Sequence, residues 1–468
     1  MTTRRTSLPT QKAGLSRRLR ASLNAARKRR LSRRRLQQTS VPAITFAALD
    51  ELDGLFNSAV ATFTSISGWP VEAGLTYDTS GFGKASVLGV TTSKNLQRSM
   101  LPLDPARTYA LHAACHNVVA GRLQFHLRDG GGNQVAGSNR YLGAHHIQIH
   151  SPANPNTTFR VALLSQGGNP QLDVLDAQIV DVTDQLAKPK AIILEFGQSN
   201  RVGAFGVSGY DPELDRPEFR AFMVPTMEAT AIGAYTDNSG STYGLSSPCG
   251  IGEPTIAASV LPHATSAQTA FGASPAVMPA LSEAKHLCDN WPTAYADHVP
   301  TFLLSGATAS SLFTEWDHES GPQGNYLRLM KANIDALLAA NPESFILGAV
   351  WQQGEADLSS HAIYAAKFSG MIAELRGLYG EFPLVIAEIG GLVATGGTQL
   401  MIDAQKKLAS NSGDPAALTK CAYVARPAGA DNTLLEDEGG AWIHFRADTN
   451  RAMGTSIGAA LVQLLATE

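Results

Sequence analysis

The chain has 468 residues, enough for two or three domains, and its 44% of hydrophobic residues is normal for a globular protein with a full core. No apolar run reaches the roughly 20 residues that a membrane-spanning helix needs, so no transmembrane segment is predicted. The four cysteines lie far apart, which argues against a zinc site or a disulfide framework and favours buried free thiols.

The net charge of -3 hides a strongly basic N-terminal arm, residues 1–41. Thirteen basic residues and no acidic one precede Asp50, and leucines recur at helical spacing among the arginines. Three roles fit such an arm: a solvated tail that folds on a partner, a segment that binds nucleic acid or an anionic membrane surface, and an anchor to a larger assembly. Because no aromatic residue is interleaved with the arginines, base stacking is unsupported, and a tail or anchor is favoured over nucleic-acid binding. The twin arginine Arg4 and Arg5 is followed by no apolar stretch, so no signal peptide is predicted.

Residues 42–185 are predicted to form an all-β domain. Short segments rich in Val, Thr, Leu and Phe alternate with turn residues and have no helical pattern between them. This spacing predicts a β-sandwich of the jelly-roll kind, which could serve in carbohydrate binding or attachment. The predicted strands are 86–90, 108–114, 121–127, 145–150, 158–164 and 177–182.

After a short linker the rhythm changes, and residues 190–468 are predicted to form an α/β domain. Apolar strands that alternate with helices imply a parallel sheet covered on both faces. A stretch rich in Gly, Pro and Ser, residues 203–262, is expected to be a lid or specificity loop. The predicted strands are 191–196, 299–304, 344–351, 382–389 and 420–424, and the predicted helices are 276–288, 326–340, 362–379, 399–410 and 451–465.

Three polar clusters follow strands of this domain or precede its last helix. Ser199 lies in Gly-Gln-Ser-Asn at 197–200, directly after the first strand, and His444 lies just before the last helix. The middle cluster, 351–357, offers amides and carboxylates. A serine, a histidine, a carboxylate and amide donors make a complete set for acyl transfer. Taken singly, the serine is more typical of a turn and the carboxylates of helix caps, so the joint occurrence in this order carries the prediction.

These motifs resemble the sialate O-acetylesterase and acetylxylan esterase branch of the SGNH hydrolases. The resemblance rests on Gly-Gln-Ser-Asn, on Trp-x-Gln-Gly-Glu-x-Asp at 351–357 and on the late His-Phe, and it covers residue 190 to the C-terminus. It implies a three-layer, flavodoxin-like domain that needs no metal and no cofactor. It also implies that Ser199 is the nucleophile and His444 the general base. The implied oxyanion donors are the backbone N–H groups of Ser199 and Gly306 and the side chain of Gln353.

The carboxylate partner of His444 is the point at which the chain departs from the pattern. Many SGNH enzymes carry Asp three residues before the histidine, and here that residue is Ala441. The resemblance makes Glu355 the first candidate and Asp357 the second. Three further carboxylates lie in the loop before the histidine, and a Ser–His dyad oriented by a backbone carbonyl is also possible. These loop residues are Glu436, Asp437 and Glu438.

The sequence as a whole predicts a serine esterase that removes O-acetyl groups from a carbohydrate through an acetyl-enzyme. A basic arm without a signal peptide, joined to a β-sandwich and a deacetylase, would suit a phage particle that modifies a host surface glycan. Virion-associated, extracellular and cytoplasmic locations all stay open. The alternative is a catalytically inactive glycan-binding or structural protein of a phage particle, a reading kept open by the missing aspartate before His444.

Overall fold

The computed structural model describes the chain in stretches, and all that follows refers to them. The basic arm lies outside these stretches, as do Ala441 and the loop carboxylates that include Asp437. Between residues 59 and 180, side chains are described only at 104–109. The described stretches are 59–62, 75–78, 84–87, 94–102, 104–120, 122–128, 134–138, 145–150, 156–164, 171–201, 214–215, 218–225, 235–236, 242–243, 255–257, 277–306, 312–313, 316, 325–391, 396–429, 431–435 and 443–467.

The N-terminal strands form two antiparallel sheets. A six-stranded sheet has the order β2-β3-β10-β5-β8, with β1 also paired to β10, and a four-stranded sheet has the order β4-β9-β6-β7. Antiparallel pairing throughout fits the predicted all-β region, and face-to-face packing of the two sheets as a sandwich stays a prediction. The strands are β1 Ala59–Thr62, β2 Leu75–Asp78, β3 Lys84–Val87, β4 Lys94–Pro102, β5 Tyr109–Ala120, β6 Arg122–Arg128, β7 Gln134–Ser138, β8 His145–His150, β9 Asn156–Leu164 and β10 Gln171–Asp181.

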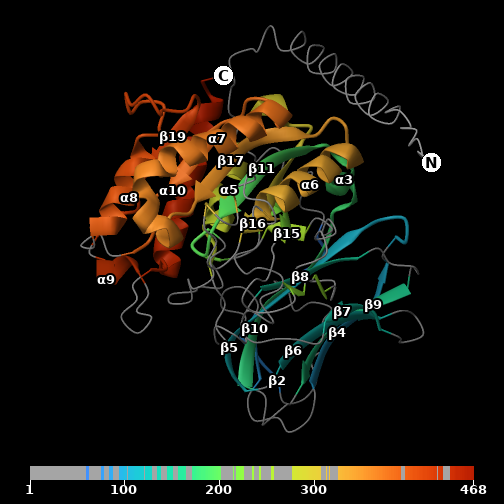
Figure 1. The fold of residues 1–468 in the computed structure, drawn as a ribbon. Coiled ribbons are helices and arrows are strands. Elements are labelled where there is room, and N and C mark those ends of the chain that lie inside the picture. The colour runs from blue at the N-terminus through green and yellow to red at the C-terminus, as the bar shows by residue number, and fades with distance from the viewer. Residues whose placement is uncertain are drawn as a thin grey trace, which may run out of the picture. The chain divides into compact units, whose positions relative to one another are not determined.

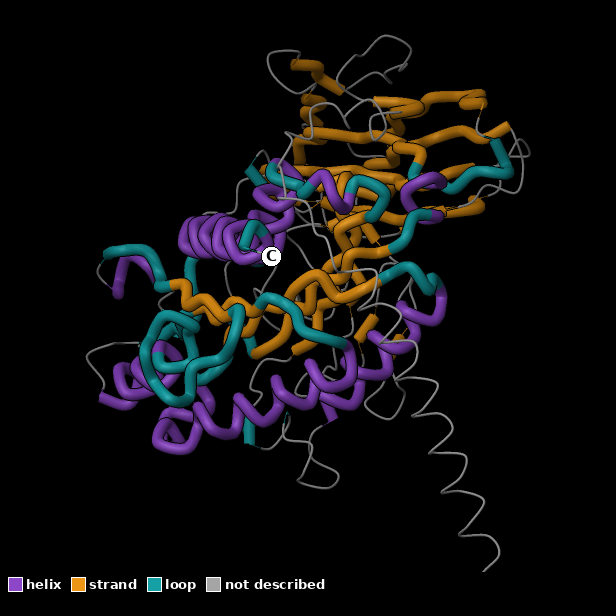
Figure 2. Tube along the Cα trace, turned by 90° about the horizontal axis from the view of Figure 1, so that it is seen from above, coloured by secondary structure: helices purple, strands orange, loops and turns teal. Residues whose placement is uncertain are grey.

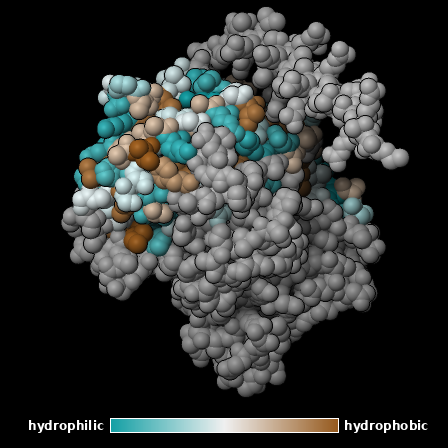
Figure 3. Space-filling view, viewed as in Figure 1, coloured by the Kyte–Doolittle hydropathy of each residue, from teal (hydrophilic) through white to brown (hydrophobic). Residues whose placement is uncertain are grey.

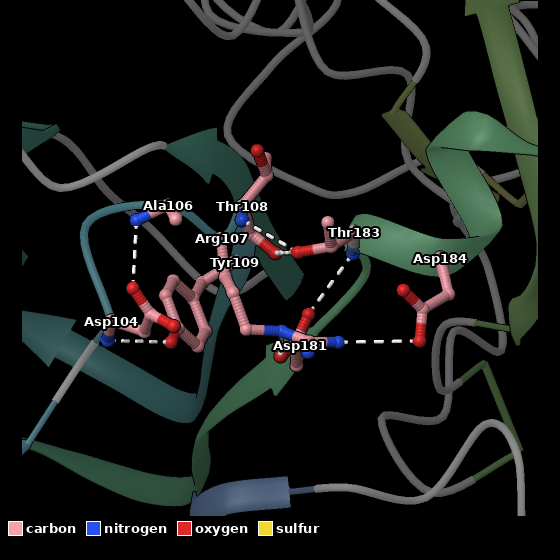
Figure 4. A network of polar contacts seen from close by, with 8 residues as sticks. All are labelled: Asp104, Ala106, Arg107, Thr108, Tyr109, Asp181, Thr183 and Asp184. Carbon is pink, nitrogen blue, oxygen red and sulfur yellow. Dashed lines mark hydrogen bonds and ion pairs between the residues drawn. The ribbon is translucent and has the colours of Figure 1, made fainter.

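Polar contacts fix the point at which the chain leaves β10 for the short helix α3 (Thr183–Ala187). The Thr183 hydroxyl accepts a hydrogen bond from the backbone N–H of Thr108 at 2.7 Å (Figure 4). The backbone N–H of Thr183 donates to Asp181 at 3.0 Å, and Arg107 forms an ion pair with the same carboxylate. Because the Arg107 side chain is 39% exposed, solvent screens this ion pair, and we expect it to contribute little to stability.

The C-terminal part is built on a seven-stranded sheet with the order β15-β12-β16-β11-β17-β18-β19 (Figure 1). Six strands are parallel and β15 is antiparallel to its neighbour. Without β12 and β15, the order in sequence numbering is 2-1-3-4-5, that of flavodoxin-like folds. The strands are β11 Lys190–Gly197, β12 Glu218–Pro225, β15 Thr255–Ala257, β16 Val299–Gly306, β17 Phe345–Gln352, β18 Leu384–Ala387 and β19 Cys421–Val424.

Helices cover both faces of this sheet, as Figure 2 shows, and the side chains of β11 explain why. Ile192 and Leu194 point to one face and pack in a core with α6, α7 and α8. Ala191 and Ile193 point to the other face and pack with α5 and α10. Every residue of β11 is buried, which is the property of a central parallel strand. The helices are α5 Pro279–Asp289, α6 Asn325–Ala340, α7 His361–Tyr379, α8 Gly396–Lys406 and α10 Ala447–Leu465.

The prediction that residues 203–262 form only a lid or loop is wrong in part. Strand β12 extends the parallel sheet beyond β16, and β15 adds an antiparallel edge strand. The apolar run Ala221–Val224 gave a strand signal that the surrounding Gly, Pro and Ser residues concealed. Most of the rest of 203–262 lies outside the described stretches, so a lid over the site stays a prediction.

The surface of the described part is mixed in polarity. Figure 3 shows hydrophobic residues as separate spots among hydrophilic ones on the coloured face. Among the described helices, none is long and apolar enough to cross a membrane.

Candidate active site

Ser199 lies at the carboxyl end of β11, and a glycine makes its position possible. Gly197 has a φ of 147°, which an L side chain rarely adopts, and a Cβ there would stand 2.1 Å from the backbone oxygen of Gln352. The backbone of β11 thus runs tightly against β17 before it turns. The N–H of Gln198 then donates to the same oxygen at 2.9 Å. Ser199 is held on this turn and is 1% exposed.

His444 lies far from Ser199 in the sequence but contacts it in the fold. Its Nε2 lies 2.7 Å from Ser199 Oγ, a hydrogen bond between residues 245 positions apart in the sequence. The neighbouring backbone is anchored, because Phe445 forms a β-bridge with Leu435 and the N–H of Arg446 donates to Leu434. A neutral imidazole in this place can accept the hydroxyl proton, which is the geometry of a serine nucleophile and its base.

The topology of the sheet explains why polar residues gather at this point. In a 2-1-3-4-5 sheet the strand order reverses between strands 1 and 3, and ligands bind outside the carboxyl ends of those strands. Here these strands are β11 and β17, which lead directly to Ser199 and Gln353. The end of β16 is also close, because Gly306 pairs in register with Gly197.

Gln353 is fully buried, and hydrogen bonds fix its side chain. Its Nε2 donates to Asp357 at 2.6 Å, and the Tyr364 hydroxyl lies 3.0 Å from its Oε1. Asp357 also accepts the backbone N–H of Leu312 at 2.7 Å. These contacts make Asp357 an orienting group for Gln353, and none of them joins Asp357 to His444.

Glu355 begins the 3-10 helix η3 (Glu355–Ser360) and reaches back toward the serine turn. Its Oε1 accepts hydrogen bonds from Asn200 Nδ2 at 2.5 Å and from the Gly390 N–H at 3.0 Å. Burial raises the pKa of Glu355, while the hydrogen bonds from its own N–H, Asn200 and Gly390 and the charge of His444 act in the opposite direction. Asn200 also bonds to Ile443, so these hydrogen bonds link Glu355 to the histidine segment.

Replacing Glu355 by glutamine is expected to make stability less dependent on pH. The pKa of Glu355 is higher in the folded chain than its ordinary value of 4.5, so wild-type stability falls as pH rises from there through the folded pKa. Glutamine carries no charge and lacks this loss. Urea unfolding between about pH 4 and about pH 8 should show that the free energy of unfolding of E355Q rises relative to that of wild type as pH rises.

The exposed Glu343→Gln is the matched control for this titration. Because Glu343 is exposed, replacing it should change the free energy of unfolding little. A difference between E355Q and wild type that does not change with pH would contradict a raised pKa of Glu355 in the folded chain.

A buried charge network that the sequence pattern did not predict lies beneath the serine turn. Arg201 forms ion pairs with Glu195 of β11 and Glu283 of α5, and all three side chains are 0% exposed. Burial raises the pKa of Glu283, and the charge and hydrogen bond of Arg201 oppose that shift. The network ties the turn to both the sheet and a helix. The one signal in the sequence was an arginine directly after the Gly-Gln-Ser-Asn motif.

The structure thus brings together Ser199 and His444 and places Gly306 and Gln353 at the ends of the two strands that flank β11. Asp437 lies outside the described residues. Among the described residues, no three His, Cys, Asp or Glu side chains are grouped so as to hold a metal ion.

Comparisons with known proteins find similarity only among solved structures. No family model matches the chain, and no curated protein matches it. The chain is similar to NanS, with 17% identity and a TM-score of 0.42 over 59% of this chain and 97% of NanS. A protein of Arabidopsis thaliana gives 16% identity and a TM-score of 0.39 over 59% of this chain and 98% of its own. A family two carbohydrate esterase from Cellvibrio japonicus gives 12% identity and a TM-score of 0.34 over 87% of this chain and 98% of its own.

Proposed function

We propose that the chain is a serine esterase that removes O-acetyl groups from a carbohydrate. The observation that carries the proposal is the 2.7 Å hydrogen bond between Ser199 Oγ and His444 Nε2 at the carboxyl end of a central parallel strand. A serine hydroxyl is a weak nucleophile on its own and is activated by a base within hydrogen-bond reach. This pair meets that requirement.

The reaction proceeds in two halves. Ser199 Oγ attacks the acetyl carbonyl carbon while His444 Nε2 takes the hydroxyl proton, and the same proton passes to the departing sugar oxygen. The acetyl group is then an ester of Ser199. A water molecule, deprotonated by His444, attacks this ester, acetate leaves, and the proton returns to Ser199.

The proposed oxyanion hole consists of the N–H groups of Ser199 and Gly306 and the Gln353 amide. Support comes from the register of Gly306 with Gly197 and from the fixed orientation of the Gln353 side chain. The bond to Asp357 uses one hydrogen of the Gln353 amide and defines where the second one points. Removing one such donor typically lowers kcat about 10²–10³-fold, because the donor stabilises the oxyanion of the transition state.

The substrate class rests on the sequence motifs rather than on the geometry. Gly-Gln-Ser-Asn and Trp-x-Gln-Gly-Glu-x-Asp are the motifs that resemble enzymes acting on acetylated sugars. We propose on the same basis that the N-terminal sheets bind or attach to a glycan. A virion setting for the basic arm remains a further proposal.

Acetate release from acetylated sugars and from p-nitrophenyl acetate tests the proposal, with wild type and Ser199→Ala compared. Wild type should release acetate from both and the variant from neither above the buffer rate. Equal release by both proteins would overturn the esterase. Glycan binding by both, without release, would favour the alternative of an inactive glycan-binding particle protein.

A further inference from the structure

We propose that Asn200 is a positioning residue that holds His444 against Ser199. This inference rests on the proposed esterase function and adds a residue to it. The Asn200 side chain bonds to the backbone on both sides of the histidine. Its Nδ2 donates to the Ile443 oxygen at 3.1 Å, and its Oδ1 accepts from the Phe445 N–H at 3.0 Å.

These two bonds matter for the site because Asn200 is next to Ser199 in the chain. Asn200 directly follows Ser199 and is 2% exposed, so its backbone belongs to the serine turn. One rigid amide therefore joins the nucleophile's turn to the base's segment. A displacement of His444 along the chain would break at least one of the two bonds.

Glu355 fixes which way the amide faces. Asn200 Nδ2 donates to Glu355 Oε1 at 2.5 Å as well as to Ile443. The nitrogen thus faces two acceptors and the oxygen faces one donor, so a rotated amide would leave every contact mismatched. Glu355 acts on the histidine segment through this amide.

A glycine in the surrounding backbone leaves the space that the Asn200 amide occupies. A Cβ on Gly390 would stand 1.8 Å from the Ile443 oxygen and 2.8 Å from Asn200 Nδ2. Only glycine permits this approach, and its N–H also donates to Glu355. Close packing of four groups around one side chain is more than a turn residue needs.

Catalysis depends on such positioning, because a displacement of about 1 Å between reacting groups can lower the rate about 10²-fold. Asn200→Ala is expected to lower kcat about 10²-fold, with KM changed less than about 3-fold. The loss is expected to fall on kcat because Asn200 is 2% exposed and bonds to the backbone beside the base.

Asn200→Asp separates hydrogen bonding from the filling of space. Aspartate has the same shape and still accepts from Phe445, but it cannot donate to Ile443 or Glu355. We expect its kcat to be at least as low as that of N200A. A kcat close to wild type for either folded variant would overturn the inference.

Asn450→Ala is the matched control, since Asn450 is also a buried asparagine near this segment. Its Nδ2 donates mainly to Val277 at 2.8 Å and reaches the Phe445 oxygen only at 3.4 Å. N450A should lower the melting temperature with kcat within about 3-fold of wild type. An equal loss of kcat in N450A and N200A would mean that any buried amide supports the segment, and would overturn the special role of Asn200.

Crystal structures of N200A and N450A give a readout that needs no turnover. The distance between Ser199 Oγ and His444 Nε2 should exceed hydrogen-bond length in N200A and remain near 2.7 Å in N450A. An unchanged distance in N200A would overturn the inference even if wild type hydrolyses esters. Wild type without esterase activity would instead overturn the proposed function, and the two failures are distinguished in this way.

Discussion

Ser199→Ala is expected to lower kcat for acetyl ester hydrolysis by at least about 10⁴-fold. The variant removes the atom that forms the acetyl ester in the proposed reaction, while the proposed oxyanion donors stay in place. These donors can still accelerate the slow hydrolysis that remains in the variant. Stopped-time acetate assays with purified protein measure the loss.

The fold should survive this change. Ser199 loses one hydrogen bond, to His444, and a typical hydrogen bond contributes only about 1 kcal/mol to stability. Ser369→Ala is the matched control, because it removes a buried hydroxyl of α7 that has no hydrogen-bond partner among the described residues. S369A should keep wild-type kcat, and a comparable loss in both variants would show that the assay reports folding.

His444→Ala is expected to lower kcat by at least about 10³-fold, because the serine then has no base to take its proton. The double variant S199A/H444A should be no slower than the slower single variant. Because the two residues act together in one proton transfer, removing the second adds little to the loss, and their effects are strongly non-additive. Rates of the four proteins complete the cycle.

A second histidine provides the control. His361 begins α7, and its Nδ1 lies 3.0 Å from the Leu358 oxygen, so it has a structural contact close to η3. H361A should keep kcat within about 3-fold of wild type. Losses in the S199A/H444A cycle that simply multiply would contradict the proton transfer between these two residues.

The parallel sheet could be predicted because its strands are continuous apolar runs. Strand β11 is buried along its whole length, and its sequence has almost no polar residue to confuse the pattern. Strand β12 was not predicted, because it is a single strand within a long Gly- and Pro-rich stretch, although its sequence contains an apolar run. Helix boundaries shifted as well: α8 begins at Gly396, where glycines masked the start that the sequence placed at residue 399.

That Ser199 and His444 lie together could be predicted because their residue types and their order in the sequence are specific. The role of Asn200 could not, because its partners are the backbone atoms of Ile443 and Phe445, which carry no residue signature. The same holds for Arg201, since only the fold shows that Glu195 and Glu283 close over it. Sequence patterns identify reactive groups more readily than the groups that hold them.

The most direct test of the account is to trap the acetyl-enzyme. Wild type would be mixed with p-nitrophenyl acetate, quenched in acid during turnover and digested for mass spectrometry. We predict one added acetyl group on the peptide that contains Ser199, and none on that peptide from H444A quenched at the same time. Turnover by wild type with acetylation at another residue, or with none at Ser199, would contradict Ser199 as the nucleophile.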